Sequence, residues 1–338
     1  MKQLTKFAGL IAASYIFLTG QNVEAASPEE FNRKMAVGVN LGNCLEAPNE
    51  GDWGLKIEPE YLKSIADAGF KHVRVPIRWS AHALKEAPYT VDAKFFERVD
   101  EVVKEALNSK LLVVLNMHHY DEFEDTPDAQ QVRFKAIWHQ IAEHFSKASK
   151  DVAFEIYNEP CKEITEERWD KLYPEVLQDI RKSNPDRVVV VGTVKYDNVH
   201  KLESLQVPDG DKHIIVTVHY YEPHHFTHQG AEWAGAESAK WLGTTWKGTD
   251  AEKSNVDADF DIAAKWGNTH NRPIYLGEFG AYSKVDMDSR ARWTRYVRES
   301  AVKRGLSAAY WEFGSGFGVY DPQRKKWREP LLDALLGK

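Results

Sequence analysis

The sequence predicts an α/β fold built as a single (β/α)8 barrel. The chain has 338 residues, which exceeds the roughly 250 residues that such a barrel typically needs. Eight short apolar runs alternate with segments of helical periodicity along it. The runs are rich in Val and Ile and mostly lack polar alternation, which is typical of parallel strands that are covered on both faces.

The elements follow in a regular order. The eight predicted strands are Met35–Asn40, His72–Ile77, Leu111–Met117, Val152–Tyr157, Val188–Val194, Ile214–Tyr220, Pro273–Gly277 and Ser307–Trp311. Apolar residues at spacings of three and four predict helices at Pro59–Ala68, Phe95–Leu107, Gln131–Phe145, Glu166–Lys182, Phe260–Trp266, Arg290–Lys303 and Pro330–Leu336. The fifth unit is weak, because only a short turn of helix around Asn198–Leu205 follows its strand.

Two predicted connections are long, Asp121–Ala129 and Glu222–Asn255. The second carries Trp233, Trp241 and Trp246. Loops of this length are usually functional, and both follow the carboxyl ends of strands, where barrel active sites are built. Most other connections are short. We therefore expect an open cleft lined by Trp, which favours attack within a chain over attack at its end. Trp241 and Trp246 could equally serve only to pack the loop onto the barrel.

The first residues resemble a targeting segment. Lys2 and Lys6 precede an apolar run from Phe7 to Leu18, and Val23-Glu24-Ala25 then provides small residues for cleavage. This pattern predicts a cleavable signal peptide over residues 1–25, one catalytic domain over residues 26–338, and a secreted or periplasmic protein. We expect no membrane association after cleavage, because no later run reaches about 18 apolar residues.

Composition restricts the class of partner. The formal net charge is -7, 28% of residues are charged and 11 are Trp, which argues against a disordered chain and a nucleic-acid partner.

Cys44 and Cys161 could form one disulfide in an oxidising compartment. We expect two free thiols instead, because these residues follow the first and fourth strands, which a barrel places far apart. We also expect a monomer.

Two strands end in a glutamate. The run Phe154–Pro160 ends in Asn158-Glu159-Pro160, and its proline cannot donate a further ladder hydrogen bond. The run Pro273–Gly280 delivers Glu278 in the same way. Paired strand-end carboxyls indicate two-carboxylate chemistry, of which glycoside hydrolysis is the commonest kind.

Polar and aromatic side chains follow most other strands as well. They are Asn40, Asn43, Arg74, Arg78, His118, His119, His219, Tyr221, Trp311 and Glu312. Each alone fits a cap or a hydrogen-bonded core residue, but the ring of them favours a site. His219 and Tyr221 are two apart and share a face of their strand. His118 and His119 are adjacent, and we expect both near the substrate because strand ends are irregular.

Seven motifs resemble the retaining glycoside hydrolases of family 5. In chain order they cover residues Gly38–Asn43, Val73–Trp79, Asn116–His119, Tyr157–Pro160, His219–Tyr221, Gly277–Gly280 and Tyr310–Phe313. Residues 46–54, 226–233 and 315–321 are also similar to a subgroup of bacterial endoglucanases that often hydrolyse both glucans and mannans.

This resemblance implies a role for each candidate residue. Glu159 is expected to be the general acid/base and Glu278 the nucleophile, kept ionised by Arg74 and Tyr221, with the two carboxyls about 5–5.5 Å apart. Asn158 is expected to bind the sugar 2-hydroxyl, and Trp311 to form the platform under the sugar. The expected supporting and subsite contacts are Asn43, Glu46, His118, His119, His219, His228 and Trp233.

The resemblance thus implies an endo-β-1,4-glucanase that needs neither cofactor nor metal and acts on a β-linked polysaccharide or oligosaccharide, with β-1,4-mannanase as the alternative main activity. A metal-dependent hydrolase would use His118, His119, His219, His224 and His225, but the first strand ends without a His pair and an acid to bridge metals is missing. A non-catalytic sugar-binding barrel would lack one glutamate. A phosphosugar enzyme would need a basic partner beside Gly314-Ser315-Gly316.

Overall fold

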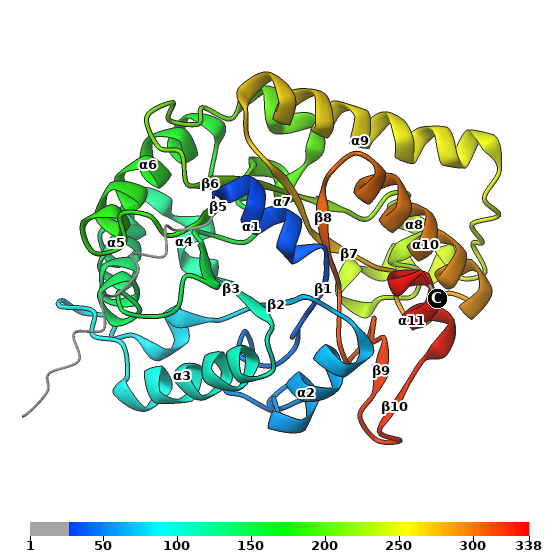
Figure 1. Cartoon of the computed structure of the whole chain (residues 1–338), viewed down its shortest axis with the longest axis horizontal. Coiled ribbons are helices and arrows are strands. Elements are labelled where there is room, and N and C mark those ends of the chain that lie inside the picture. Colours follow the sequence, from blue (N-terminus) through cyan, green and yellow to red (C-terminus); the bar gives the residue numbers. More distant parts are fainter. Residues whose placement is uncertain (1–26, 338) are drawn as a thin grey trace, which may run out of the picture.

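The computed structural model describes residues 27–337 and forms a closed barrel of eight parallel strands, each paired with the next and β8 paired with β1 (Figure 1). The strands are β1 (Val37–Asn40), β2 (His72–Val75), β3 (Leu112–Asn116), β4 (Val152–Glu155), β5 (Val189–Gly192), β6 (Ile214–Tyr220), β7 (Ile274–Phe279) and β8 (Ser307–Tyr310). The predicted (β/α)8 barrel is confirmed. The predicted signal peptide lies outside the described residues.

Helices surround the barrel. They are α1 (Pro28–Met35), α2 (Pro59–Ala68), α3 (Ala93–Asn108), α4 (Asp121–Asp125), α5 (Pro127–His144), α6 (Glu166–Ser183), α7 (Val194–Asp197), α8 (His224–Thr227), α9 (Asp250–His270), α10 (Met287–Lys303) and α11 (Glu329–Leu336). Short 3₁₀ turns cover Trp79–His82, Val199–Ser204, Glu232–Ala234 and Ala236–Trp241. The weak fifth unit is confirmed, because only α7 and the turn at 199–204 follow β5.

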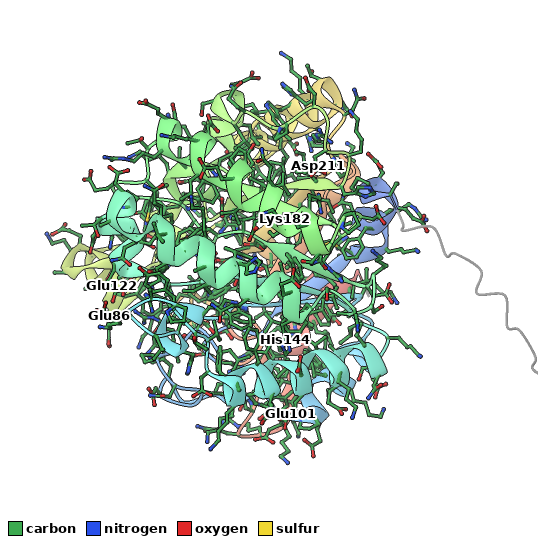
Figure 2. All side chains as sticks on the ribbon, turned by 90° about the vertical axis from the view of Figure 1, so that its left-hand side faces the viewer. Glu86, Glu101, Glu122, His144, Lys182 and Asp211 are labelled. Carbon is green, nitrogen blue, oxygen red and sulfur yellow. The ribbon has the colours of Figure 1, made fainter. Side chains whose placement is uncertain are left out.

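The outer helices are amphipathic in the way that the sequence predicts. Helix α3 begins after Asp92, whose side chain accepts the Lys94 backbone N–H, and it buries Val99 and Val103 against the barrel. Its opposite face is charged. Figure 2 shows the outer surface of α3, α5 and α6, where Glu101, His144 and Lys182 point to solvent. Burying Val99 or Val103 contributes roughly 1.5–3 kcal/mol to the free energy of unfolding.

Helix α1 closes the amino-terminal end of the barrel and was not predicted. It is short and offers only Phe31 and Met35 as buried large apolar residues, too few for a periodic pattern. Both join the apolar cluster that fills the barrel interior, with Leu112, Val114 and Ile215 among its members. The opposite end of the barrel is thereby left to hold a cavity.

Several connections carry more structure than the sequence suggested. The predicted loop at 121–129 contains α4 and the start of α5. Helix α9 begins at Asp250 rather than near Phe260, because Thr249 and Glu252 form a capping box. A two-stranded hairpin, β9 (Tyr320–Asp321) and β10 (Lys326–Trp327), was not predicted.

Two expectations about the chain as a whole concern cysteine and membranes. Cys44 and Cys161 are both buried and free, as expected. Within residues 27–337, no helix is both long enough and apolar enough to cross a bilayer.

Candidate active site

A cavity of about 930 Å³ opens at the carboxyl ends of the strands. Its lining includes eleven of the predicted residues: Asn43, His118, His119, Asn158, Glu159, His219, Tyr221, His228, Trp233, Glu278 and Trp311. Two predicted residues, Arg74 and Glu46, lie beneath the lining and are fully buried. The structure therefore brings the strand-end residues together, as their positions in a barrel require.

Arg74 on β2 organises the floor of this cavity. Its guanidinium donates to both oxygens of Glu155, at 2.7 and 2.6 Å, and to Oε1 of Glu278 at 2.6 Å. It also donates to the side-chain oxygens of Asn40 and Asn158, each at 2.8 Å. Because Asn158 uses its oxygen in this way, its NH2 group is turned toward the cavity as a donor. The planar guanidinium presents several N–H donors in fixed directions, so Arg74 can contact all four of these side chains at once.

Glu278 is held from two sides. Its Oε1 accepts from Arg74, and its Oε2 accepts the hydroxyl of Tyr221 at 2.8 Å. Burial raises the pKa of Glu278 above the usual carboxyl value, whereas His219, Arg74 and the Tyr221 hydrogen bond lower it. Glu278 lies within β7, one residue before the strand ends at Phe279, whereas the predicted strand ended at Gly277.

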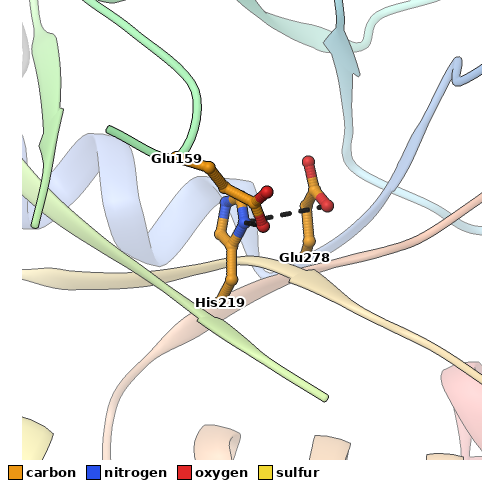
Figure 3. A group of neighbouring side chains, drawn as sticks. All are labelled: Glu159, His219 and Glu278. Carbon is orange, nitrogen blue, oxygen red and sulfur yellow. Dashed lines mark hydrogen bonds and ion pairs between the residues drawn. The ribbon is translucent and has the colours of Figure 1, made fainter. Parts of the chain in front are cut away.

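His219 stands between the two glutamates. A register irregularity between Val218 and His219 pairs His219 with Glu278 across β6 and β7, so the two side chains lie together. The imidazole Nδ1 is 2.8 Å from Oε1 of Glu159 and 3.7 Å from Oε2 of Glu278, and Figure 3 shows the three side chains converging. Burial lowers the pKa of His219 to about 4, so the ring is neutral near pH 7.

Glu159 has a different environment from Glu278. It follows β4 with a left-handed φ of 51°, and a quarter of its side chain is exposed to the cavity. Its hydrogen-bonding neighbour is the neutral His219 rather than a cation. Burial raises the pKa of Glu159 to about 7, although Arg74 acts in the opposite direction. At neutral pH a large fraction of this carboxyl therefore carries a proton.

Aromatic side chains form the walls. Trp311 stacks on His118 with 10° between the planes and 5.7 Å between the ring centroids. His119 has a left-handed φ of 51°, which is why it reaches the cavity beside its neighbour His118. On the loop after β6, Trp233 is 62% exposed and packs edge-on against Tyr282.

The predicted role of Glu46 as a subsite contact does not fit its position. Its carboxyl accepts the backbone N–H groups of Asn43 and Cys44, and burial raises its pKa to about 8. Glu312 acts in the same way under the neighbouring loop, where it accepts N–H groups from Ser315 and Phe317. These glutamates hold the loops that border the cavity, which explains why they are buried rather than facing a ligand.

The expectation of a Trp-lined loop holds for one of its three Trp residues. Trp246 is 1% exposed and packs near Tyr296, and Trp241 contacts His224 at an edge. Neither lines the cavity, in contrast to Trp233. Trp246 packs the loop against helix α10, whereas Trp241 contacts another part of the same loop.

Sequence reasoning missed several site residues. Trp53, 41% exposed, lines the cavity beside His119, and its signal was a Trp set among Gly51 and Gly54 after the first strand. Glu155, the buried partner of Arg74, was hidden inside an apolar strand. Asp197 belongs to the fifth βα unit, whose helical pattern was too weak for its residues to be placed from the sequence.

The spacing of three site residues bears on the metal-dependent alternative. Among residues 27–337, the cluster with ligand spacing is Glu159, His219 and Glu278, whose ligand atoms lie within 4.8 Å of one another. Arg74 Nη1 already contacts Glu278 at 2.6 Å, so a positive charge occupies one side of this cluster. Of the five histidines of the metal-hydrolase alternative, His219 belongs to this cluster, whereas His118, His119, His224 and His225 do not.

Comparisons with known proteins agree with this geometry. Residues 36–316 match the family model described as Cellulase (glycosyl hydrolase family 5). Endoglucanase H of Acetivibrio thermocellus is 36% identical over 318 residues, which are 92% of this chain and 34% of that protein, so the chain spans about a third of its length.

Solved structures match over nearly the whole chain. Endoglucanase Cel5A from Thermotoga maritima is 47% identical with a TM-score of 0.90, covering 92% of this chain and all of that one. A hyperthermophilic endo-β-1,4-glucanase in complex with substrate is 46% identical with a TM-score of 0.91, covering 93% and 100% of the two chains. The match to the family model, together with these relatives, shows that the chain belongs to the cellulase family, glycosyl hydrolase family 5, and is a glycoside hydrolase.

Proposed function

We propose that this chain is a secreted, retaining endo-β-1,4-glucanase in which Glu159 is the acid/base and Glu278 the nucleophile. The observation that carries the proposal is the closeness of the two carboxyls, with an oxygen of each within 4.8 Å of the other beside His219. Inverting enzymes keep their carboxyls about 6.5–9.5 Å apart to admit water between carboxyl and sugar, whereas retaining enzymes keep them at about 5–5.5 Å.

In the first step, Glu278 attacks the anomeric carbon and the glycosidic bond breaks. The proton of Glu159 passes to the leaving oxygen, so the products are a glycosyl ester on Glu278 and an ionised Glu159. Arg74 and Tyr221 support this assignment, because both favour an ionised Glu278 before attack. The NH2 group of Asn158 is free to bind the 2-hydroxyl.

In the second step, the roles reverse. Esterification removes the negative charge of Glu278, which lowers the proton affinity of Glu159 and turns it into a base. Glu159 takes a proton from water, the water oxygen attacks the anomeric carbon, and the ester bond to Glu278 breaks. Both carboxyls return to their first state and the product keeps the β configuration.

We propose that the substrates include both glucan and mannan chains. Structures of the Thermotoga maritima relative are described in complex with cellobiose and with mannotriose. The walls of this cavity support the same range, because stacking on Trp233, Trp53 and Trp311 tolerates either orientation of one hydroxyl. The N-terminal pattern of Lys2, Lys6 and an apolar run supports export.

Two glutamine variants test the assignment of the glutamates. Glu278→Gln is expected to lose activity on both barley glucan and 2,4-dinitrophenyl β-cellobioside, because no nucleophile remains. Glu159→Gln is expected to lose activity on glucan but to release one burst of dinitrophenol and then stall, because that leaving group needs no proton.

The matched control is Glu232→Gln, which changes an exposed glutamate of the loop after β6 and is expected to behave as the parent enzyme. Azide is expected to restore turnover to Glu159→Ala on the dinitrophenyl substrate. Substantial turnover by Glu278→Gln would remove Glu278 as the nucleophile.

A further inference from the structure

A buried acidic side chain, Asp197, lies directly behind Glu159. Its Oδ2 accepts the backbone N–H of Glu159 at 3.0 Å. The same oxygen is 3.4 Å from Nε2 of His219, whose Nδ1 is 2.8 Å from the Glu159 carboxyl. Asp197 therefore reaches Glu159 by two routes, directly at the backbone and through the imidazole at the side chain.

The backbone around Asp197 is held in an unfavourable conformation. Lys195, Tyr196 and Asp197 are consecutive left-handed residues with φ of 60°, 66° and 53°. Residues other than glycine seldom adopt this conformation, and three in a row occur only where the surroundings enforce them. Here the turn sends Asp197 inward beneath Glu159, while Lys195 and Tyr196 line the cavity.

The space for the Asp197 carboxyl is closely fitted. A Cβ at Gly192 would lie 1.8 Å from Asp197 Oδ1, so the glycine is needed for this carboxyl to fit. Among residues 27–337, Asp197 Oδ1 and His219 Nε2 are buried atoms without a hydrogen-bond partner.

The charges that face Asp197 favour its neutral form. Glu155 and Glu159 lie nearby, and the guanidinium of Arg74 is already shared between Glu155 and Glu278. Burial, followed by these two acidic neighbours, raises the pKa of Asp197 well above the usual range, and Arg74 opposes the shift only in part. An unpaired buried carboxylate would be costly, whereas a protonated carboxyl both accepts and donates.

We propose that Asp197 is a positioning residue for the acid/base: an uncharged carboxyl that fixes the backbone of Glu159 and the tautomer of His219. A proton on Oδ2 faces Nε2, so the imidazole carries its own proton on Nδ1, toward Glu159. The Nδ1–H then stabilises the carboxylate that forms when Glu159 gives its proton to the leaving group. This inference rests on the proposed role of Glu159.

Two variants separate the two contacts of the Asp197 carboxyl. Asp197→Asn keeps an uncharged group with an oxygen for the Glu159 N–H, but this oxygen carries no proton for Nε2. Asp197→Gly removes the group, and glycine adopts a φ of 53° without strain. Lys110→Gly, at an exposed left-handed residue with φ of 64°, is the matched control for relief of backbone strain and is expected to leave the kinetics unchanged.

The readout is kcat/KM on cellotetraose, which needs the acid, and on 2,4-dinitrophenyl β-cellobioside, which does not. Asp197→Gly is expected to lose about tenfold or more on cellotetraose, a part of the roughly 10²–10⁴-fold that general acid catalysis contributes, and no more than about threefold on the dinitrophenyl substrate. For Asp197→Gly, kcat/KM on cellotetraose is expected to fall at a lower pH than in the parent enzyme. Water entering the vacated space reduces the burial that raises the pKa of Glu159. Asp197→Asn is expected to restore the basic limb, because it fills the vacated space, but to recover only part of the rate on cellotetraose, because its oxygen has no proton for Nε2.

Equal losses of Asp197→Gly on the two substrates, or an unmoved basic limb, would show a merely structural role and overturn the inference. Full recovery of the cellotetraose rate in Asp197→Asn would show that a proton facing Nε2 is not needed, and would overturn the proposed protonated carboxyl. Glu159→Gln, measured in parallel, distinguishes a failure of the proposed function from a failure of this inference. If its loss does not depend on the leaving group, the proposed function fails; if it does while that of Asp197→Gly does not, only this inference fails.

Discussion

Two buried glutamates differ in chemistry because their neighbours differ. Glu278 faces a guanidinium at 2.6 Å and a hydroxyl at 2.8 Å, whereas Glu159 faces a neutral imidazole. An opposite charge favours the ionised form of a carboxyl, and burial alone favours the protonated form. Glu278 is therefore held toward the ionised form and Glu159 toward the protonated form. In the proposed mechanism, two residues of the same type can therefore serve as nucleophile and as acid/base.

This division predicts a pH dependence. The first step needs a protonated Glu159, whose pKa is raised to about 7, so kcat/KM on barley glucan is expected to fall as pH rises through about 7. On 2,4-dinitrophenyl β-cellobioside the basic limb of kcat/KM is expected to vanish, because the acid is not needed. A basic limb that is the same for both substrates would instead assign it to a group other than the acid.

The residue scale also marks the limit of sequence reasoning. Both glutamates could be predicted because a Glu at the end of an apolar strand is conspicuous. Glu155 could not, since a single charge inside an apolar run gives no sign of its partner Arg74, which is 81 positions away. Glu46 was misplaced because a loop carboxyl facing a ligand and one facing backbone N–H groups look alike in sequence.

At the scale of elements, the loop after β6 carries both an anchoring residue and a residue of the cavity wall. Trp246 attaches it to the barrel through Tyr296 of α10, and Trp241 packs within the loop against His224, while Trp233 remains 62% exposed in the cavity wall. The sequence could place the loop and its Trp residues. It could not say which of them would be buried, because burial depends on the neighbouring helix α10 and on contacts with Tyr282 and Tyr296.

We therefore expect Trp233→Ala to weaken binding of polymer. Loss of a stacking surface worth about 0.5–1.5 kcal/mol corresponds to a rise in KM of roughly 2–10-fold for soluble β-1,4-glucan, with a smaller rise for a short aryl glycoside that does not reach this wall. Trp241→Ala, outside the lining, is the control.

The parent enzyme is expected to reduce the viscosity of a soluble β-1,4-glucan steeply while forming few new reducing ends, as an open cleft requires. Steady release of cellobiose with viscosity almost unchanged would contradict the open cleft.

At the scale of the whole molecule, stability and function occupy opposite ends of the barrel. Helix α1 seals the amino-terminal end with Phe31 and Met35, and the cavity opens at the carboxyl end. Repetition made the barrel predictable, because eight similar units repeat one pattern. Elements that occur once, such as α1, the β9–β10 hairpin and the left-handed turn at 195–197, repeat nothing and were missed.

The central claim, double displacement by Glu159 and Glu278, is tested most directly by the configuration of the first product. Proton NMR of the anomeric region, recorded in the first minutes of hydrolysis of a cello-oligosaccharide, separates the two anomers before mutarotation mixes them. Two successive inversions at one carbon predict that the β anomer appears first and the α anomer grows in later. An initial α anomer would contradict the account, because it requires a single displacement by water and leaves Glu278 without its role as nucleophile.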